Sequence, residues 1–116
     1  MNKNQNEEAT IVFMTAPNRD EASRIAEHLL EAKLAACVQI LPEIESIYRW
    51  KGKTQHEREV LILAKTTAAR FPELDMEVRA MHSYETPEII AVPATRISEP
   101  YRAWLVDSVS DRRAED

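Results

Sequence analysis

The 116-residue chain has little of several features that particular classes of protein need. Its only glycine is Gly52, and a loop that cradles phosphate groups needs several glycines. Its only cysteine is Cys37, so no disulfide forms within the chain, and its first residues are polar, with no apolar signal core. No apolar run approaches the roughly 18 residues that span a bilayer. We therefore expect a cytoplasmic protein with no membrane partner and no P-loop.

Clustered positive charge is also absent. The chain has 15 Lys and Arg against 20 Asp and Glu, for a formal net charge of −5, and the basic residues are scattered. Proteins bind nucleic acid largely by neutralising its phosphates with clustered cations, so we expect no nucleic-acid partner. The length suits one domain. We expect this domain at 9–110, between an unstructured polar tail at 1–8 and a charged tail at 111–116.

The middle of the chain predicts a long β-hairpin. One strand begins near Cys37, and a second ends near Thr66. Gly52 marks the turn, because glycine adopts positive φ at little cost. The second strand is apolar on both faces, with Val60, Ile62 and Ala64 on one side and Leu61 and Leu63 on the other. Helices of the same chain can cover one face, and the other face needs a partner.

Periodicity and capping residues predict the other elements. They are a strand at 9–15, a helix from Asn18 to about Lys33, a helix over 67–82, a strand at 88–92 and a helix after Ser98. Pro72 leaves two alternatives for the second helix: an irregular first turn, or a regular start at Pro72 itself. Asn18 and Glu21 form a capping-box-like pair. The expected inward residues are Ala22, Ile25, Ala26, Leu29, Leu30, Phe71, Leu74, Val78, Met81, Tyr101, Trp104, Leu105 and Val109.

The predicted element order, β-α-β-β-α-β with a terminal helix, indicates an α+β fold of the ferredoxin-like type. In that arrangement two helices cover one face of a four-stranded antiparallel sheet. The opposite face of this sheet would also be apolar, which favours assembly of several copies through their sheets.

A series of short motifs, in this order and spacing, resembles the CutA divalent-cation tolerance proteins. The motifs are Thr15-Ala16-Pro17, Lys33-Leu34-Ala35-Ala36-Cys37, Tyr48-Arg49-Trp50-Lys51-Gly52-Lys53, Glu59, Lys65-Thr66, His82-Ser83-Tyr84-Glu85-Thr86-Pro87-Glu88-Ile89, Tyr101 and Trp104. The resemblance implies a ferredoxin-like fold and a tight homotrimer with an architecture similar to that of the PII signalling proteins. It also implies a non-enzymatic protein that binds copper or another divalent cation. The alternative is a PII-like sensor of a small anionic ligand, and an enzyme that uses Tyr84 and Lys65 is a third hypothesis.

Two residues are candidate metal ligands. Cys37 offers a soft thiolate, which suits copper, and the family motif Ala-Ala-Cys matches here; the alternative is a buried core cysteine. His82 offers an imidazole to Cu(II), and the alternative is a favourable charge at a helix C-terminus.

A second group of residues matches positions that resemble the inter-subunit cleft of the family and predicts a small-molecule site. Taken singly, the aromatic residues are as well explained by packing and the charged residues by solvent. A buried Lys65 would need a carboxylate such as Glu59 or Glu88. The group consists of Tyr48, Trp50, Glu59, Lys65, Tyr84, Glu88 and Trp104.

Overall fold

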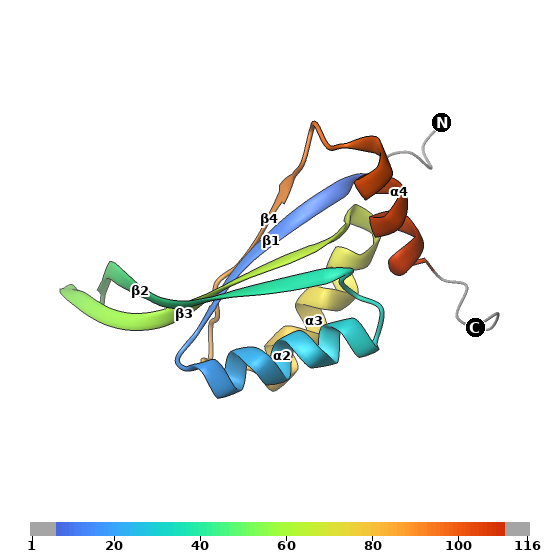
Figure 1. The fold of residues 1–116 in the computed structure, drawn as a ribbon. Helices are drawn as coiled ribbons and strands as arrows, with labels where there is room; N and C mark the ends of the chain where they lie inside the picture. The colour runs from blue at the N-terminus through green and yellow to red at the C-terminus, as the bar shows by residue number, and fades with distance from the viewer. Residues whose placement is uncertain (1–6, 111–116) are drawn as a thin grey trace.

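The computed structural model describes residues 7–110 (Figure 1). The predicted tail at 111–116, and residues 1–6 of the N-terminal tail, lie outside the described residues. The elements are β1 (Ala9–Ala16), α2 (Arg19–Glu31), β2 (Cys37–Trp50), β3 (Lys53–Thr67), the 3-10 helix η1 (Ala68–Arg70), α3 (Phe71–Met81), β4 (Ile89–Pro93) and α4 (Glu99–Ser108). This order confirms the predicted α+β class.

The strands form one antiparallel sheet in the order β2-β3-β1-β4. Helices α2 and α3 lie side by side under one face of it (Figure 1). Val60, Ile62 and Ala64 are buried in the core on that face, as predicted. Leu61 and Leu63 point to the other face and are only partly buried. The alternation in β3 therefore does give the strand two apolar faces.

We call the second face of the sheet the open face, because α2 and α3 do not cover it. Leu41, Ile90 and Val92 lie on it and are 40%, 55% and 41% exposed. Helix α4 packs against β3 and β1 at one end, where Leu105 is buried. The rest of the open face remains accessible in the single chain.

Strands β2 and β3 continue beyond the other strands as a two-stranded projection, which we call the arm (residues 44–59). The arm begins where β1 stops pairing with β3, at the pair of Ala16 and Val60. It extends the molecule to 48 Å in its longest dimension (Figure 1). Its turn has φ of 53° at Lys51 and 78° at Gly52. A two-residue hairpin turn with positive φ at both positions matches the twist of the strands, so Gly52 lies where the sequence predicts.

Helix α2 begins and ends at well-defined caps. The side-chain oxygen of Asn18 accepts from the Glu21 backbone N–H at 2.9 Å, which confirms half of the predicted pair. At the other end Lys33 has φ of 58°, and Leu34 N–H donates to the Leu29 carbonyl at 2.8 Å. Both leucines are buried. This left-handed cap with its apolar contact ends α2 without a glycine.

The structure decides between the two alternatives for Pro72 and corrects two other details of the predicted helices. The irregular first turn before α3 is the 3-10 helix η1, so the first alternative for Pro72 is confirmed. Leu30, Tyr101 and Trp104 are 45%, 38% and 47% exposed, so their prediction as inward residues is wrong for the single chain. Ser98 precedes α4 without a side-chain capping bond.

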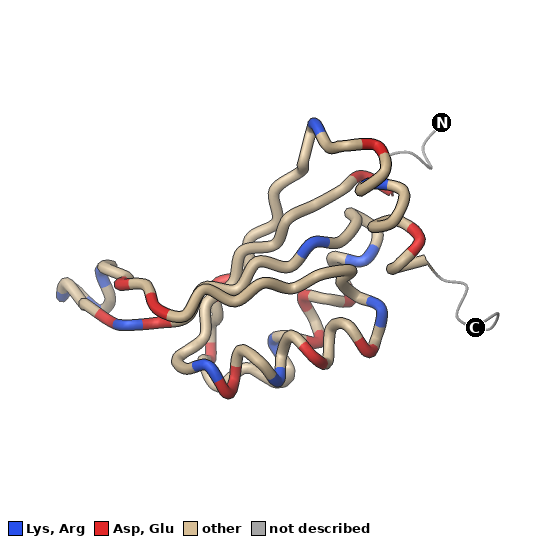
Figure 2. The backbone as a smooth tube through the Cα atoms, viewed as in Figure 1, with Lys and Arg blue, Asp and Glu red and all other residues tan. Residues whose placement is uncertain are grey.

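The basic side chains are scattered over the described residues (Figure 2). Both signs alternate along α2 and along the arm, and the central strands carry little charge (Figure 2). Among residues 7–110, no helix is long and apolar enough to cross a membrane.

Replacing Ile62 by Ala should lower the free energy of unfolding by about 2–5 kcal/mol, because Ile62 is fully buried between the sheet and its helices. The matched control is Ile47→Ala on the partner strand, where the side chain is 60% exposed, and its effect should be much smaller. Urea denaturation measures both. Equal effects would contradict the described core.

Candidate functional site

A groove of about 720 Å³ opens at the base of the arm, on the open face of the sheet. Its walls come from the end of β1, from β2 and β3, and from the segment 84–88 that leads into β4. It is lined by Thr15, Ser46, Ile47, Tyr48, Trp50, Gln55, Glu57, Glu59, Tyr84, Glu85, Thr86 and Glu88.

A β-bulge decides which residues of β2 face the groove. The pairing of β2 with β3 shifts between Leu41 and Ile44, so that Leu41 pairs with Leu61 and Ile44 pairs with Glu59. An extra residue in one strand changes which of its side chains share a face with the partner strand. Beyond the bulge, even-numbered residues of β2, such as Ser46, therefore join odd-numbered residues of β3, such as Glu57, on the open face.

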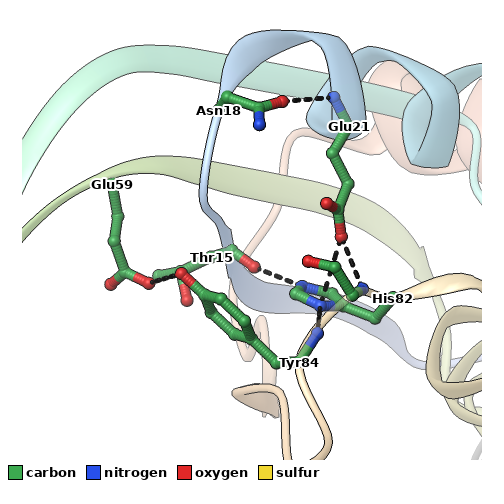
Figure 3. A network of polar contacts seen from close by, with 7 residues as sticks. Thr15, Asn18, Glu21, Glu59, His82 and Tyr84 are labelled. Atoms are coloured by element: carbon green, nitrogen blue, oxygen red, sulfur yellow. Dashed lines mark hydrogen bonds and ion pairs between the residues drawn. The ribbon is translucent and has the colours of Figure 1, made fainter.

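Glu59 lies at the centre of the groove wall. Its side chain accepts two hydrogen bonds, at 2.6 Å from the Ser46 hydroxyl and at 2.7 Å from the Tyr84 hydroxyl (Figure 3 shows the bond to Tyr84). The residue is 8% exposed, and it forms no ion pair with any residue of 7–110. Glu59 is thus a buried carboxylate held in place by neutral donors.

The tyrosines beside this carboxylate are held in their neutral form. Burial is the largest cause that raises the pKa of Tyr84 above its ordinary value of 10.0, followed by the hydrogen bond to Glu59 and by nearby negative charge. The pKa of Tyr48 is raised first by its hydrogen bond to Glu57. Each tyrosine therefore donates to a carboxylate across the neutral pH range.

The side chain of His82 contacts backbone atoms of Thr15 and Tyr84 and holds Tyr84 in position (Figure 3). The His82 side chain is fully buried. Its Nε2 lies 2.8 Å from the Thr15 carbonyl oxygen, and its Nδ1 lies 3.0 Å from the Tyr84 backbone nitrogen. The carbonyl can only accept and the N–H can only donate, so the imidazole is neutral with its proton on Nε2. His82 thereby joins β1 to the segment that carries Tyr84.

Glu21 completes this network from the first turn of α2. One of its carboxylate oxygens accepts from the Ser83 backbone N–H at 2.8 Å and lies 3.3 Å from Nδ1 of His82. Burial by itself raises the pKa of this carboxyl, but the hydrogen bonds from Ser83 and the positive charge of Arg24 lower it, and the pKa stays below 4.5. The second half of the predicted capping box is therefore absent, because this carboxylate binds Ser83 instead of its own helix end.

The groove brings together five of the seven predicted small-molecule residues: Tyr48, Trp50, Glu59, Tyr84 and Glu88. Lys65 and Trp104 lie elsewhere. Lys65 is six residues from Glu59 along β3, or about 20 Å, and its Nζ donates to the side chain of Gln39 at 2.6 Å. Within one chain Lys65 is only partly buried and bonds to Gln39 rather than to Glu59 or Glu88, and a pairing across an inter-subunit cleft stays a prediction. Trp104 contacts Tyr101 on α4, with ring centroids 5.3 Å apart.

The two predicted metal ligands lie at different ends of the sheet. Cys37 pairs with Lys65, which in turn pairs with Ile11. His82 contacts Thr15, four residues or about 13 Å farther along β1. Within the described residues, no group of three His, Cys, Asp or Glu side chains is placed to hold a metal ion. Copper binding at Cys37 and at His82 would therefore be two separate events.

Sequence reasoning missed other groove residues, among them Ser46, Glu57 and Glu85. The alternation of Glu57 with Glu59 could have indicated that they share a face. No comparable pattern reveals Ser46, because its side of the strand depends on the bulge.

Residues 10–108 match the CutA1 divalent ion tolerance protein family. The chain belongs to this family. It is 44% identical over 95 residues to the divalent-cation tolerance protein CutA of Thermus thermophilus, covering 82% of this chain and 92% of that protein. It is 43% identical over 98 residues to the chloroplastic protein CutA of Arabidopsis thaliana, and it spans 54% of the length of that relative.

The fold agrees with solved CutA structures. The periplasmic divalent cation tolerance protein CutA from Archaeoglobus fulgidus superposes with a TM-score of 0.86 at 42% identity, covering 88% of this chain and 99% of that chain. The predicted resemblance is thus confirmed, and the match to the CutA1 family includes every groove residue. CutA relatives described as chloroplastic and as periplasmic lie in different compartments, so membership of the family does not decide where this protein resides.

Replacing Tyr84 by Phe should cost about 1 kcal/mol of stability at pH 7, because the Glu59 carboxylate loses one of its two donors. Tyr48→Phe is the matched control and should cost less, because Tyr48 is exposed and its carboxylate partner lies in solvent. Urea denaturation measures the difference. A cost for Tyr48→Phe equal to that for Tyr84→Phe would contradict the special place of Glu59.

The same pair gives a pH test. A pKa that is raised in the folded state contributes stability below the unfolded value of 10.0, and this contribution is lost as the pH rises toward the folded value. The free energy of unfolding should therefore fall more steeply above pH 10.0 in the wild type than in Tyr84→Phe. Parallel curves would contradict the raised pKa.

Proposed function

We propose that this CutA-family protein binds copper or another divalent cation and contributes to tolerance of it, as a non-enzymatic homotrimer in the cytoplasm. The observation that carries the proposal is the family match over residues 10–108, together with relatives in two prokaryotes that are named for divalent-cation tolerance. The acidic net charge and the scatter of the basic residues support the expectation of no nucleic-acid partner.

The open face supports the proposed homotrimer. Helices α2 and α3 bury one side of the sheet, and exposed apolar side chains such as Leu41, Ile90 and Val92 remain on the other. A continuous apolar patch on a sheet is stabilised by burial against another protein surface. A second copy of this chain carries the same patch, so closed assembly of copies covers it without another partner.

Replacing Ile90 by Lys should break the assembly, because Ile90 is exposed in the single chain and a lysine there would be buried without a partner in the trimer. Met76→Lys adds the same charge on α3, at a residue that is 54% exposed, and should leave the assembly intact. Light scattering measures the mass against the 13.3 kDa of one chain. A wild-type mass of one chain would overturn the trimer.

Copper binding is proposed at two residues, with different oxidation states. His82 is the candidate ligand for Cu(II), and Cys37 is the candidate for Cu(I), because thiolate is the softer ligand. Each has a structural contact that metal binding would disturb. Nδ1 of His82 would have to release the Tyr84 N–H, and the half-buried Cys37 thiol lies against the Tyr101 hydroxyl. Oxygen ligands alone are the usual set for Mg²⁺ and Ca²⁺, so a copper site is expected to include the imidazole or the thiolate.

Calorimetric titration of the wild type, Cys37→Ser and His82→Ala with each oxidation state tests these assignments. Cu(II) binding should weaken at least tenfold in His82→Ala and remain in Cys37→Ser, and Cu(I) should show the reverse. Circular dichroism of His82→Ala shows whether the variant still folds without the contacts of His82. Identical copper binding by all three proteins would remove the support for both residues.

The alternative of a small anionic ligand in the inter-subunit cleft has no supporting contact within one chain. Four glutamates line the groove, and no Lys, Arg or His of the described residues does. Like charge repels an anion, so we do not propose an anion sensor.

A further inference from the structure

We infer that helices α2 and α3 together bind a divalent transition-metal ion such as Zn²⁺, held between the imidazole of His28 and the carboxylate of Glu77. The inference goes beyond the proposed copper assignments, because it involves neither Cys37 nor His82. It rests on the contact between the two side chains, on the chemistry of the pair and on its place in the fold.

The fold brings the two side chains together from distant parts of the chain. Nε2 of His28 lies 2.6 Å from a carboxylate oxygen of Glu77, which follows it by 49 positions. His28 lies in the last turn of α2, and Glu77 lies in α3. Their chain neighbours Leu29 and Val78 are fully buried in the core. The core therefore fixes both backbones, and side chains on packed helices are held more precisely than side chains on loops.

The pair offers the ligand atoms of a zinc-type site. Imidazole nitrogen suits Zn²⁺, Cu²⁺ and Ni²⁺, and carboxylate oxygen also binds Zn²⁺. Bonds of about 2.0–2.2 Å to one ion place two neighbouring ligand atoms about 3 Å apart. The observed 2.6 Å between the nitrogen and the oxygen is close to this separation. The proton between the two atoms leaves Nε2 when the ion binds, either for Nδ1 or for water.

The pair is open to solvent in the single chain and in the proposed assembly. The His28 and Glu77 side chains are 40% and 36% exposed, so water can fill the remaining positions around the ion. Helices α2 and α3 cover the face of the sheet opposite the open face (Figure 1). Assembly through the open face therefore leaves the pair accessible, and each copy of the chain carries a complete site.

Glu77 has no other cation beside it. Among residues 7–110, its one ion pair is the contact with His28. A second pair of this kind, His56 with Glu45, lies on the arm at 3.3 Å, with side chains 59% and 61% exposed. Ordering freely exposed side chains around an ion costs more conformational entropy. The pair between the helices is therefore the tighter site.

Calorimetric titration of the whole protein with Zn²⁺, with Mg²⁺ as the hard cation, tests the inference. The Zn²⁺ Kd should rise about tenfold or more in His28→Gln and in Glu77→Gln, because each variant keeps only one of the two ligands. The double variant should bind about as weakly as His28→Gln, because both side chains act on one ion. Mg²⁺, which prefers oxygen ligands, should not bind there.

Two matched controls separate this site from general surface binding. Asp75→Asn removes a carboxylate from the same helix α3, where it pairs with Arg79 at 3.1 Å. His56→Gln removes the more exposed histidine. Each should leave the Zn²⁺ Kd within about twofold, because neither contributes a ligand and distant surface charges are screened by salt.

Three outcomes would overturn the inference: a Zn²⁺ Kd unchanged in His28→Gln or in Glu77→Gln, equal weakening in His56→Gln or Asp75→Asn, or Mg²⁺ binding that depends on His28 and Glu77. Titration of Cys37→Ser and His82→Ala with Zn²⁺ distinguishes this site from the proposed copper residues. Zn²⁺ binding that persists in both and is lost in His28→Gln supports the inference, whatever copper does in those variants.

Discussion

The rest of the structure depends on covering both apolar faces of β3. This strand is central to the hairpin and pairs with β2 on one side and with β1 on the other. Helices α2 and α3 bury the face of Val60 and Ile62, and α4 covers only one end of the opposite face. Residues 7–110 contain no further helix for the remaining surface. The apolar open face and the arm therefore have the same origin: a hairpin longer than the body that supports it.

The side chains of the arm differ chemically from those on the rest of the open face. The bulge between Leu41 and Ile44 reverses the side on which the residues of β2 lie, so Ser46 meets Glu59 where Leu41 meets Leu61. An apolar face thus becomes a polar, acidic one within a few residues of the same sheet. The groove is the point at which the covered body ends and this acidic surface begins.

The contacts of His82 explain how the groove keeps its form. The imidazole joins the carbonyl of Thr15 to the N–H of Tyr84, and Glu21 holds the intervening Ser83. Tyr84 in turn donates to Glu59. A copper ion that binds His82 would therefore also displace Tyr84. Such binding would change the shape of the groove. Cys37 lies outside this network, beside Tyr101.

The sequence by itself determined the order of elements, the turn at Gly52, the cap at Asn18 and the two faces of β3, because each depends on neighbours within a few residues. It also determined the family, through motifs spread along the chain. Only the tertiary structure decided which of those motifs meet. Periodicity assigns a residue to a face but not to an end of the sheet, and within one chain Lys65 and Trp104 lie far from Glu59, so they can share a site with it only between subunits. The bulge and the contact of Tyr84 with Glu59 depend on long-range pairing, which no local pattern encodes.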